Sequence, residues 1–157
     1  MTAEPDITLR SAPISKVRLR AWLKLLKVTG QIEAALRRKL RDDHATTLPR
    51  FDVMAALARY PEGLKMSDLS GYLRVSNGNV TGIIDRLSED GLALRVAVAG
   101  DRRAHIARLT PAGEAAFAAM AAEHEAWIDS MLAALDADAA RQLTALLARV
   151  DSGASAR

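Results

Sequence analysis

The chain of 157 residues has 22 Lys and Arg against 19 Asp and Glu, a formal net charge of +3, and half of its residues are apolar although only 4% are aromatic. It contains no cysteine, which excludes disulfides, thiolate zinc sites and thiol-based redox sensing, and its three histidines lie too far apart in sequence to suggest another metal site. No apolar run approaches the roughly 20 residues that span a bilayer and no signal peptide opens the chain, so we expect a cytoplasmic protein with no cofactor and no membrane contact.

The N-terminal part is expected to be a flexible arm followed by a long basic helix. Residues 1–14 contain two prolines and no apolar period. From about residue 14 to 41, apolar side chains recur every three or four residues, which predicts one amphipathic helix. Residues 10–41 carry ten basic side chains and one acidic side chain, a net charge of +9. This uneven distribution of charge suits a protein that binds a polyanion through one part of its surface. For any single basic cluster, a helix face solvated by water is the more common explanation.

The middle of the chain, residues 46–110, has the pattern of three short helices and a β-hairpin. Thr47 is a plausible N-cap for the first helix, and Ser67 and Ser76 are plausible N-caps for the next two. A short extended piece at residues 65–66 precedes the second helix. Residues 92–99 and 104–109 then alternate as strands do, with Gly100 permitting the turn between them. We therefore predict a mainly α protein with a small β-hairpin wing, that is, a winged helix-turn-helix DNA-binding domain.

The third of these helices has two contrasting faces. One face is apolar and predicted to be buried, with Val80, Ile83, Ile84 and Leu87. The other is small and uncharged, with Asn77, Gly78, Asn79, Thr81 and Gly82. Glycine inside a helix costs about 1 kcal/mol against alanine, so the absence of bulk needs a reason. Close approach to base edges in a DNA groove supplies one, and tight packing against another helix is the alternative.

Two more helices are predicted in the segment 111–150, with Thr110 and Asp136 as their N-caps, before a flexible tail at residues 151–157. The terminal helical regions, residues 15–45 and 111–150, carry more apolar surface than a small DNA-binding unit can cover. We therefore expect them to form a homodimerisation region, which would place two DNA-reading helices in successive major grooves. The alternative is a monomer whose terminal helices pack only on each other.

From about residue 16 to 150 the chain resembles the MarR family of bacterial transcription regulators. The resemblance is carried by TTLPRFDVMAAL (46–57), MSDLSGYLRVSNGNVTGIIDRLSEDGL (66–92) and DRRAHIARLTPAGEAAF (101–117). The last segment contains the pattern Asp-x-Arg followed by Leu-Thr-x-x-Gly. The resemblance implies an obligate homodimer, a palindromic operator in double-stranded DNA, and a small ligand, often an aromatic acid or phenol, that changes DNA binding.

The resemblance also implies roles for individual side chains. Arg103 would enter the minor groove, Asp101 would hold Arg103 in position, and Arg102 would lie on or near a phosphate. Arg86 would contact either a phosphate or Asp85. The remaining residues expected at the DNA, mostly facing the major groove, are Ser67, Ser76, Asn77, Gly78, Asn79 and Thr81.

Within the family, the chain is most similar to regulators of aromatic-acid catabolism, including the hydroxycinnamate group, some of which respond to a coenzyme A thioester. The basic cluster Arg37, Arg38, Lys39 and Arg41 would suit the phosphates of such a ligand, while a solvated helix end or an additional DNA contact are the alternatives. Trp22 is either a core residue or the first aromatic candidate for the ligand pocket. Arg18 and the weaker candidate His44 complete the expected ligand-binding set.

No enzyme signature is present: the chain lacks GxSxG, HExxH and a glycine-rich phosphate loop. We therefore expect no catalytic activity. Together with the resemblance, this leads us to expect a ligand-responsive transcriptional repressor. The alternative function is a winged-helix protein-interaction module without specific DNA binding.

Overall fold

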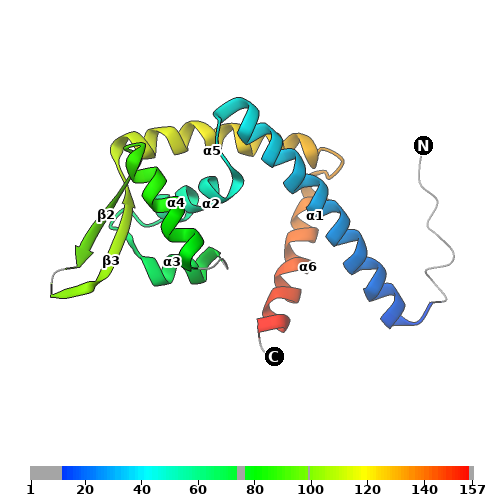
Figure 1. Cartoon of the computed structure of the whole chain (residues 1–157). Helices are drawn as coiled ribbons and strands as arrows, with labels where there is room; N and C mark the ends of the chain where they lie inside the picture. Colours follow the sequence, from blue (N-terminus) through cyan, green and yellow to red (C-terminus); the bar gives the residue numbers. More distant parts are fainter. Residues whose placement is uncertain (1–11, 74–76, 99, 156–157) are drawn as a thin grey trace. The chain divides into compact units, whose positions relative to one another are not determined.

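The computed structural model describes residues 12–73, 77–98 and 100–155. Figure 1 shows the elements in chain order: α1 (Ile14–His44), α2 (Leu48–Ala58), β1 (Leu64–Lys65), α3 (Met66–Leu73), α4 (Asn77–Glu89), β2 (Ala93–Val98), β3 (Asp101–Leu109), α5 (Pro111–Met131) and α6 (Ala137–Ser155). The prediction of a mainly α protein with a small β-hairpin wing is confirmed. The chain divides into two compact units between Asp52 and Val53. No helix in the described residues is long and apolar enough to cross a membrane.

The first unit consists of α1 and the start of α2. Helix α1 continues three residues beyond the predicted end at Arg41, because Ala45 takes a left-handed conformation only after His44 and its N–H bonds to the Arg41 carbonyl at 3.1 Å. Thr47 caps α2 as predicted, since its Oγ1 accepts the Arg50 N–H at 3.3 Å. Leu36 and Leu40 are buried, whereas large apolar side chains in the first half of α1 are more than half exposed: Ile14, Leu19, Trp22, Leu23 and Leu26.

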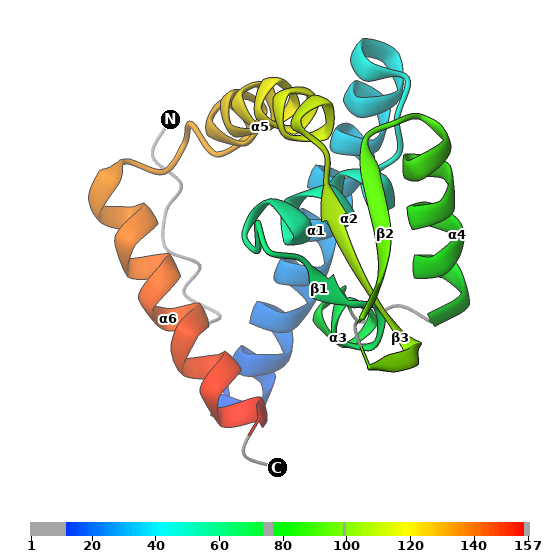
Figure 2. The same cartoon turned by 90° about the vertical axis from the view of Figure 1, so that its left-hand side faces the viewer.

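The second unit is built around a three-stranded antiparallel sheet in the order β1-β3-β2 (Figure 2). The extended piece expected at residues 65–66 lies one residue earlier, as the strand β1, in which Leu64 pairs with Ala107 and Lys65 with Ile106 of β3, while Met66 already begins α3. The predicted buried face of α4 is confirmed. The core of this unit comprises Val53, Met54, Ala56, Leu57, Leu69, Val80, Ile83, Ile84, Leu87, Ala93, Ala107, Leu109 and Met120.

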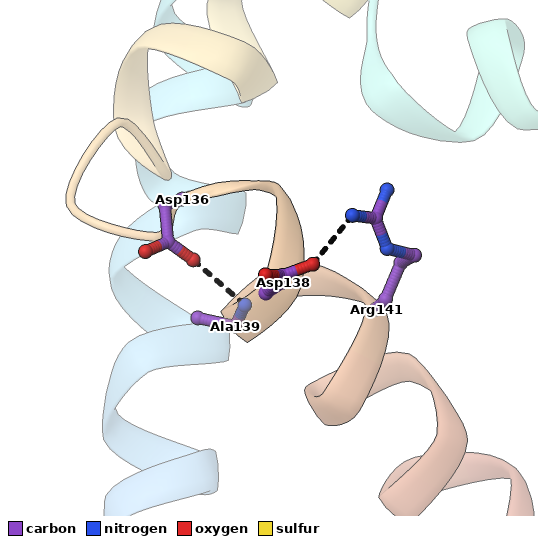
Figure 3. A network of polar contacts seen from close by, with 4 residues as sticks. All are labelled: Asp136, Asp138, Ala139 and Arg141. Atoms are coloured by element: carbon purple, nitrogen blue, oxygen red, sulfur yellow. Dashed lines mark hydrogen bonds and ion pairs between the residues drawn. The ribbon is translucent and has the colours of Figure 1, made fainter.

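Helix boundaries in the second unit follow local hydrogen bonds, with one correction. Helix α3 begins at Met66 instead of being capped by Ser67, and the Ser67 hydroxyl bonds to Asp68 Oδ1 at 3.4 Å in the first turn. Helix α5 is capped by Thr110 as predicted. Helix α6 is capped by Asp136, whose Oδ1 accepts the Ala139 N–H at 2.8 Å (Figure 3). A carboxylate there also complements the positive end of the helix dipole.

Candidate nucleic-acid interface

Helix α4 has the bare outer face that its sequence suggests. Gly78, Asn79, Gly82 and Arg86 are exposed, and Thr81 is half-buried. A Cβ built at Gly78 or Gly82 would meet no heavy atom within 4 Å, so within the described residues no helix packs against either position. The packing alternative for these glycines therefore finds no support among the described residues, where both positions are exposed. Ser76 lies outside the described residues, as does the side chain of Asn77.

The wing is attached directly to α4. Arg95 of β2 forms an ion pair with Asp85 of α4, with Nη1 and Oδ1 3.6 Å apart. Both side chains are partly exposed, so this pair adds at most about 1 kcal/mol of stability, but it fixes the side of the hairpin that faces the helix. The ion pair that Asp85 forms is with Arg95, and no Arg86–Asp85 ion pair occurs among the described residues. Among the described residues Arg86 has no ion-pair partner, which leaves its guanidinium available to a phosphate.

The hairpin ends in a tight turn at Gly100, whose φ of +85° lies in the left-handed region. Strands β2 and β3 pair from Ala93↔Leu109 to Val98↔Asp101, with an irregularity between Ala97 and Val98. The exposed Asp101 therefore stands next to the turn. The side chains of Arg102 and Arg103 lie outside what the structure describes, but their positions in β3 directly follow Asp101. The geometry places the predicted wing residues at the end of a hairpin that contacts α4 (Figure 2).

The predicted ligand-binding residues all lie on α1, and the structure does not gather their charges into one site. Arg37 pairs with Glu33 at 3.4 Å, and Arg41 pairs with Asp42 at 3.2 Å, both at the exposed surface. Arg18 and Arg38 are exposed, while Lys39 and His44 are half-buried. Trp22 is 56% exposed, so within this chain it is not a core residue. Two of the four cations in the basic cluster thus already have carboxylate partners on their own helix.

A cavity of about 490 Å³ lies where α5 ends and α6 begins, a feature that the sequence did not reveal. Its lining includes the apolar residues Ile128, Leu132 and Leu135 and the acidic residues Glu125 and Asp129. Because α5 ends at Met131 and α6 begins at Ala137, Leu132 and Leu135 lie in the segment that connects the two helices. No group of three or more potential metal ligands occurs among the described residues.

Comparison with known proteins gives a consistent result. The family model described as MarR family matches residues 46–104. The chain is 30% identical over 129 residues to the HTH-type transcriptional regulator PecS of Dickeya dadantii, covering 81% of this chain and 77% of that protein. It is 29% identical over 117 residues to the transcriptional activatory protein BadR of Rhodopseudomonas palustris, covering 72% of this chain and 66% of that protein, just under two thirds of its length.

Solved structures agree with these relatives. A MarR family transcriptional regulator from Silicibacter pomeroyi is 33% identical with a TM-score of 0.75, and the match covers 91% of this chain and 99% of that one. Sco3205 of Streptomyces coelicolor, a MarR family regulator solved in complex with DNA, has a TM-score of 0.78 at 20% identity, covering 97% and 92% of the two chains. At 20% identity, the similarity to Sco3205 shows a shared fold alone.

Proposed function

The chain belongs to the MarR family of DNA-binding transcription regulators, and from that premise we propose that it is a homodimeric repressor that binds a palindromic operator and releases it when a small aromatic ligand binds. Its homologues and fold are those of regulators and not of enzymes. The observation that carries the DNA-reading part of the proposal is the bare, exposed face of α4 beside the hairpin.

In this proposal α4 enters the major groove and the hairpin lies over the adjacent minor groove. The residues that would read bases are Ser76, Asn77, Asn79 and Thr81, with Gly78 permitting close approach. Ser67, Arg86 and Arg102 would contact phosphates. Arg103 would enter the minor groove, with Asp101 holding its guanidinium. Sco3205, a protein of the same fold, has been solved in complex with DNA, so this fold is compatible with DNA binding.

The replacement Arg103→Ala tests the wing. The operator is a duplex that the wild-type chain selects from a randomised pool. We expect the variant to bind this duplex more weakly. We also expect the slope of log affinity against log salt concentration to fall by about one unit, because one positive charge next to the phosphates is lost. Fluorescence anisotropy at several KCl concentrations measures both. Arg141→Ala, on α6 where the side chain pairs with Asp138, is the matched control and should keep the wild-type slope. An Arg103→Ala slope and affinity equal to wild type would remove the wing from the interface.

We assign dimerisation to the terminal helical regions, residues 15–45 and 111–150, and DNA binding to residues 46–110. The support is the exposed apolar surface on α1 and on α6, which a monomer leaves in water. A dimer whose α4 helices occupy two successive major grooves would also exclude other proteins from that stretch of DNA, which favours repression. The competing function, a protein-interaction module, would show no salt-dependent DNA binding in the same titrations.

We propose an aromatic acid or its coenzyme A thioester as the effector, bound near Trp22. The exposed indole supplies a stacking surface, and Arg18, Arg38, Lys39 and His44 lie along the same helix to meet a carboxylate or phosphates. Arg37 and Arg41, which pair with Glu33 and Asp42 at the exposed surface, belong to the same basic set. A melting temperature raised by a hydroxycinnamate or by its thioester would support the proposal. No binding of either compound by calorimetry would refute it.

A further inference from the structure

One side chain, Thr110, joins the end of α4 to the start of α5. Its Oγ1 donates to the carbonyl of Gly91 at 2.7 Å and accepts the N–H of Gly113 at 3.0 Å. Its backbone N–H donates to the next carbonyl, that of Leu92, at 3.0 Å. Capping α5 requires only the bond from Gly113. The bond to Gly91, nineteen residues earlier in the chain, is therefore an additional connection between two helices.

The turn that receives these bonds is itself fixed to α4. Gly91 has a φ of +74° and its N–H bonds to the Ser88 carbonyl at 3.0 Å, while the Leu92 N–H bonds to the Leu87 carbonyl at 2.8 Å. This is the Schellman arrangement, which closes the last turn of a helix. Leu87 is fully buried. Thr110 thus holds the rigid end of α4 and not a loose loop.

The other side of the junction leaves no free space. A Cβ built on Gly113 would lie 1.9 Å from the Leu92 carbonyl oxygen, so the first turn of α5 rests directly on the backbone that follows α4. Helix α5 is 21 residues long, which gives a length of roughly 30 Å. A tilt of about 6° at the junction moves the far end of such a helix by roughly 3 Å, close to the 3.4 Å rise of one base pair.

We infer that Thr110 is a positioning residue that fixes the angle between α4 and α5, and that it thereby sets the half-site spacing that the dimer accepts. The consequence for spacing rests on the proposed function, whereas the fixed angle is a property of the single chain. The hydroxyl is suited to this role because it donates and accepts at the same time. An aspartate at this position would still accept the Gly113 N–H but has no proton to donate to Gly91.

Three substitutions separate the cap from the connection. Thr110→Ser keeps both bonds, Thr110→Asp keeps only the cap, and Thr110→Val keeps neither. The first readout is the distance between spin labels at Gly82→Cys on α4 and Ala119→Cys on α5, which the absence of native cysteine makes selective. Labelled chains are diluted with unlabelled chains so that only distances within one chain are measured.

We expect a narrow distance distribution for the wild-type and Thr110→Ser backgrounds and a broad or shifted one for Thr110→Asp and Thr110→Val. Equal distributions in all four would overturn the inference without touching the proposed function. A Thr110→Val chain that melts at lower temperature but keeps the narrow distribution would also overturn it, because the hydroxyl would then contribute only stability.

The second readout uses duplexes whose half-site separation is that of the selected operator or is changed by one base pair. We expect the preference for the selected spacing to fall about fivefold in Thr110→Asp, the ratio expected from one lost hydrogen bond, and by at least as much in Thr110→Val, which loses both side-chain bonds. An unchanged preference in both variants overturns the link to spacing. If the wild-type chain selects no duplex at all, the proposed function fails while the label distances still decide the fixed angle.

Discussion

Replacement of Gly113 by alanine is expected to lower the free energy of unfolding by about 3 kcal/mol, near the upper end for overpacking of a closed site. The added methyl group would lie 1.9 Å from the carbonyl oxygen and 2.9 Å from the carbonyl carbon of Leu92. Both are main-chain atoms in a turn held by the bonds of Thr110 and Leu87, so no side-chain rotation relieves the clash. The start of α5 has to move away from the end of α4.

Urea unfolding followed by circular dichroism measures this loss as a lower midpoint. Gly82→Ala is the matched control, because Gly82 also lies in a helix but a Cβ there meets nothing within 4 Å. We expect that variant to be as stable as wild type or more stable by up to about 1 kcal/mol. A Gly113→Ala chain with the wild-type midpoint would mean that the junction can open at little cost, and the fixed angle between α4 and α5 would lose its physical basis.

Much of the helical structure could be predicted because its signals are local. The capping residues Thr47, Thr110 and Asp136 lie next to the helices that they cap, and a side-chain oxygen needs only the N–H three residues later. The buried face of α4 follows from the spacing of Val80, Ile83, Ile84 and Leu87, which the helix period alone determines.

In the wing, local sequence signals are not enough to predict which side chains are buried. Leu94 and Val96 lie on one side of β2 by simple alternation, yet both are 44% exposed, and the buried residue of this strand is Ala93. Alternation identifies two faces but not which face meets the core, because that depends on how the sheet packs. The partner of β1 and the pairing of Asp85 with Arg95 likewise depend on residues distant in sequence.

The candidate site, too, could be predicted from the sequence only in part. The bare face of α4 was visible in the sequence, since glycine and small polar residues replace the usual charged exterior of a helix. The connection through Thr110 was not visible beyond its capping role, because nothing near Thr110 in sequence indicates that Gly91 lies within hydrogen-bonding distance. The basic cluster on α1 was visible in the sequence, but the pairing of Arg37 with Glu33 and of Arg41 with Asp42 was not.

The double replacement Leu146→Asp with Val150→Asp is expected to convert the proposed dimer into a monomer at micromolar concentration. Leu143, Leu146, Leu147 and Val150 are 37%, 55%, 41% and 65% exposed. At 100° per residue they fall within about 100° of the surface of α6, the width of a stripe that packs against a partner. Two carboxylates in that stripe would have to be buried without partners, which outweighs what the remaining apolar contacts contribute.

Operator affinity should fall by a factor of about 100 or more, since each half-site then binds a separate chain and the advantage of linked sites is lost. Light scattering after size exclusion gives the mass, and anisotropy titration gives the affinity. The control is Ala145→Asp with Ala148→Asp, which adds the same charge to the opposite face of the same helix and should leave both unchanged. A double variant that stays dimeric and keeps wild-type affinity would exclude this face of α6 from the interface. The apolar half of α1, where Leu19, Trp22, Leu23 and Leu26 are more than half exposed, would then have to supply the subunit contact.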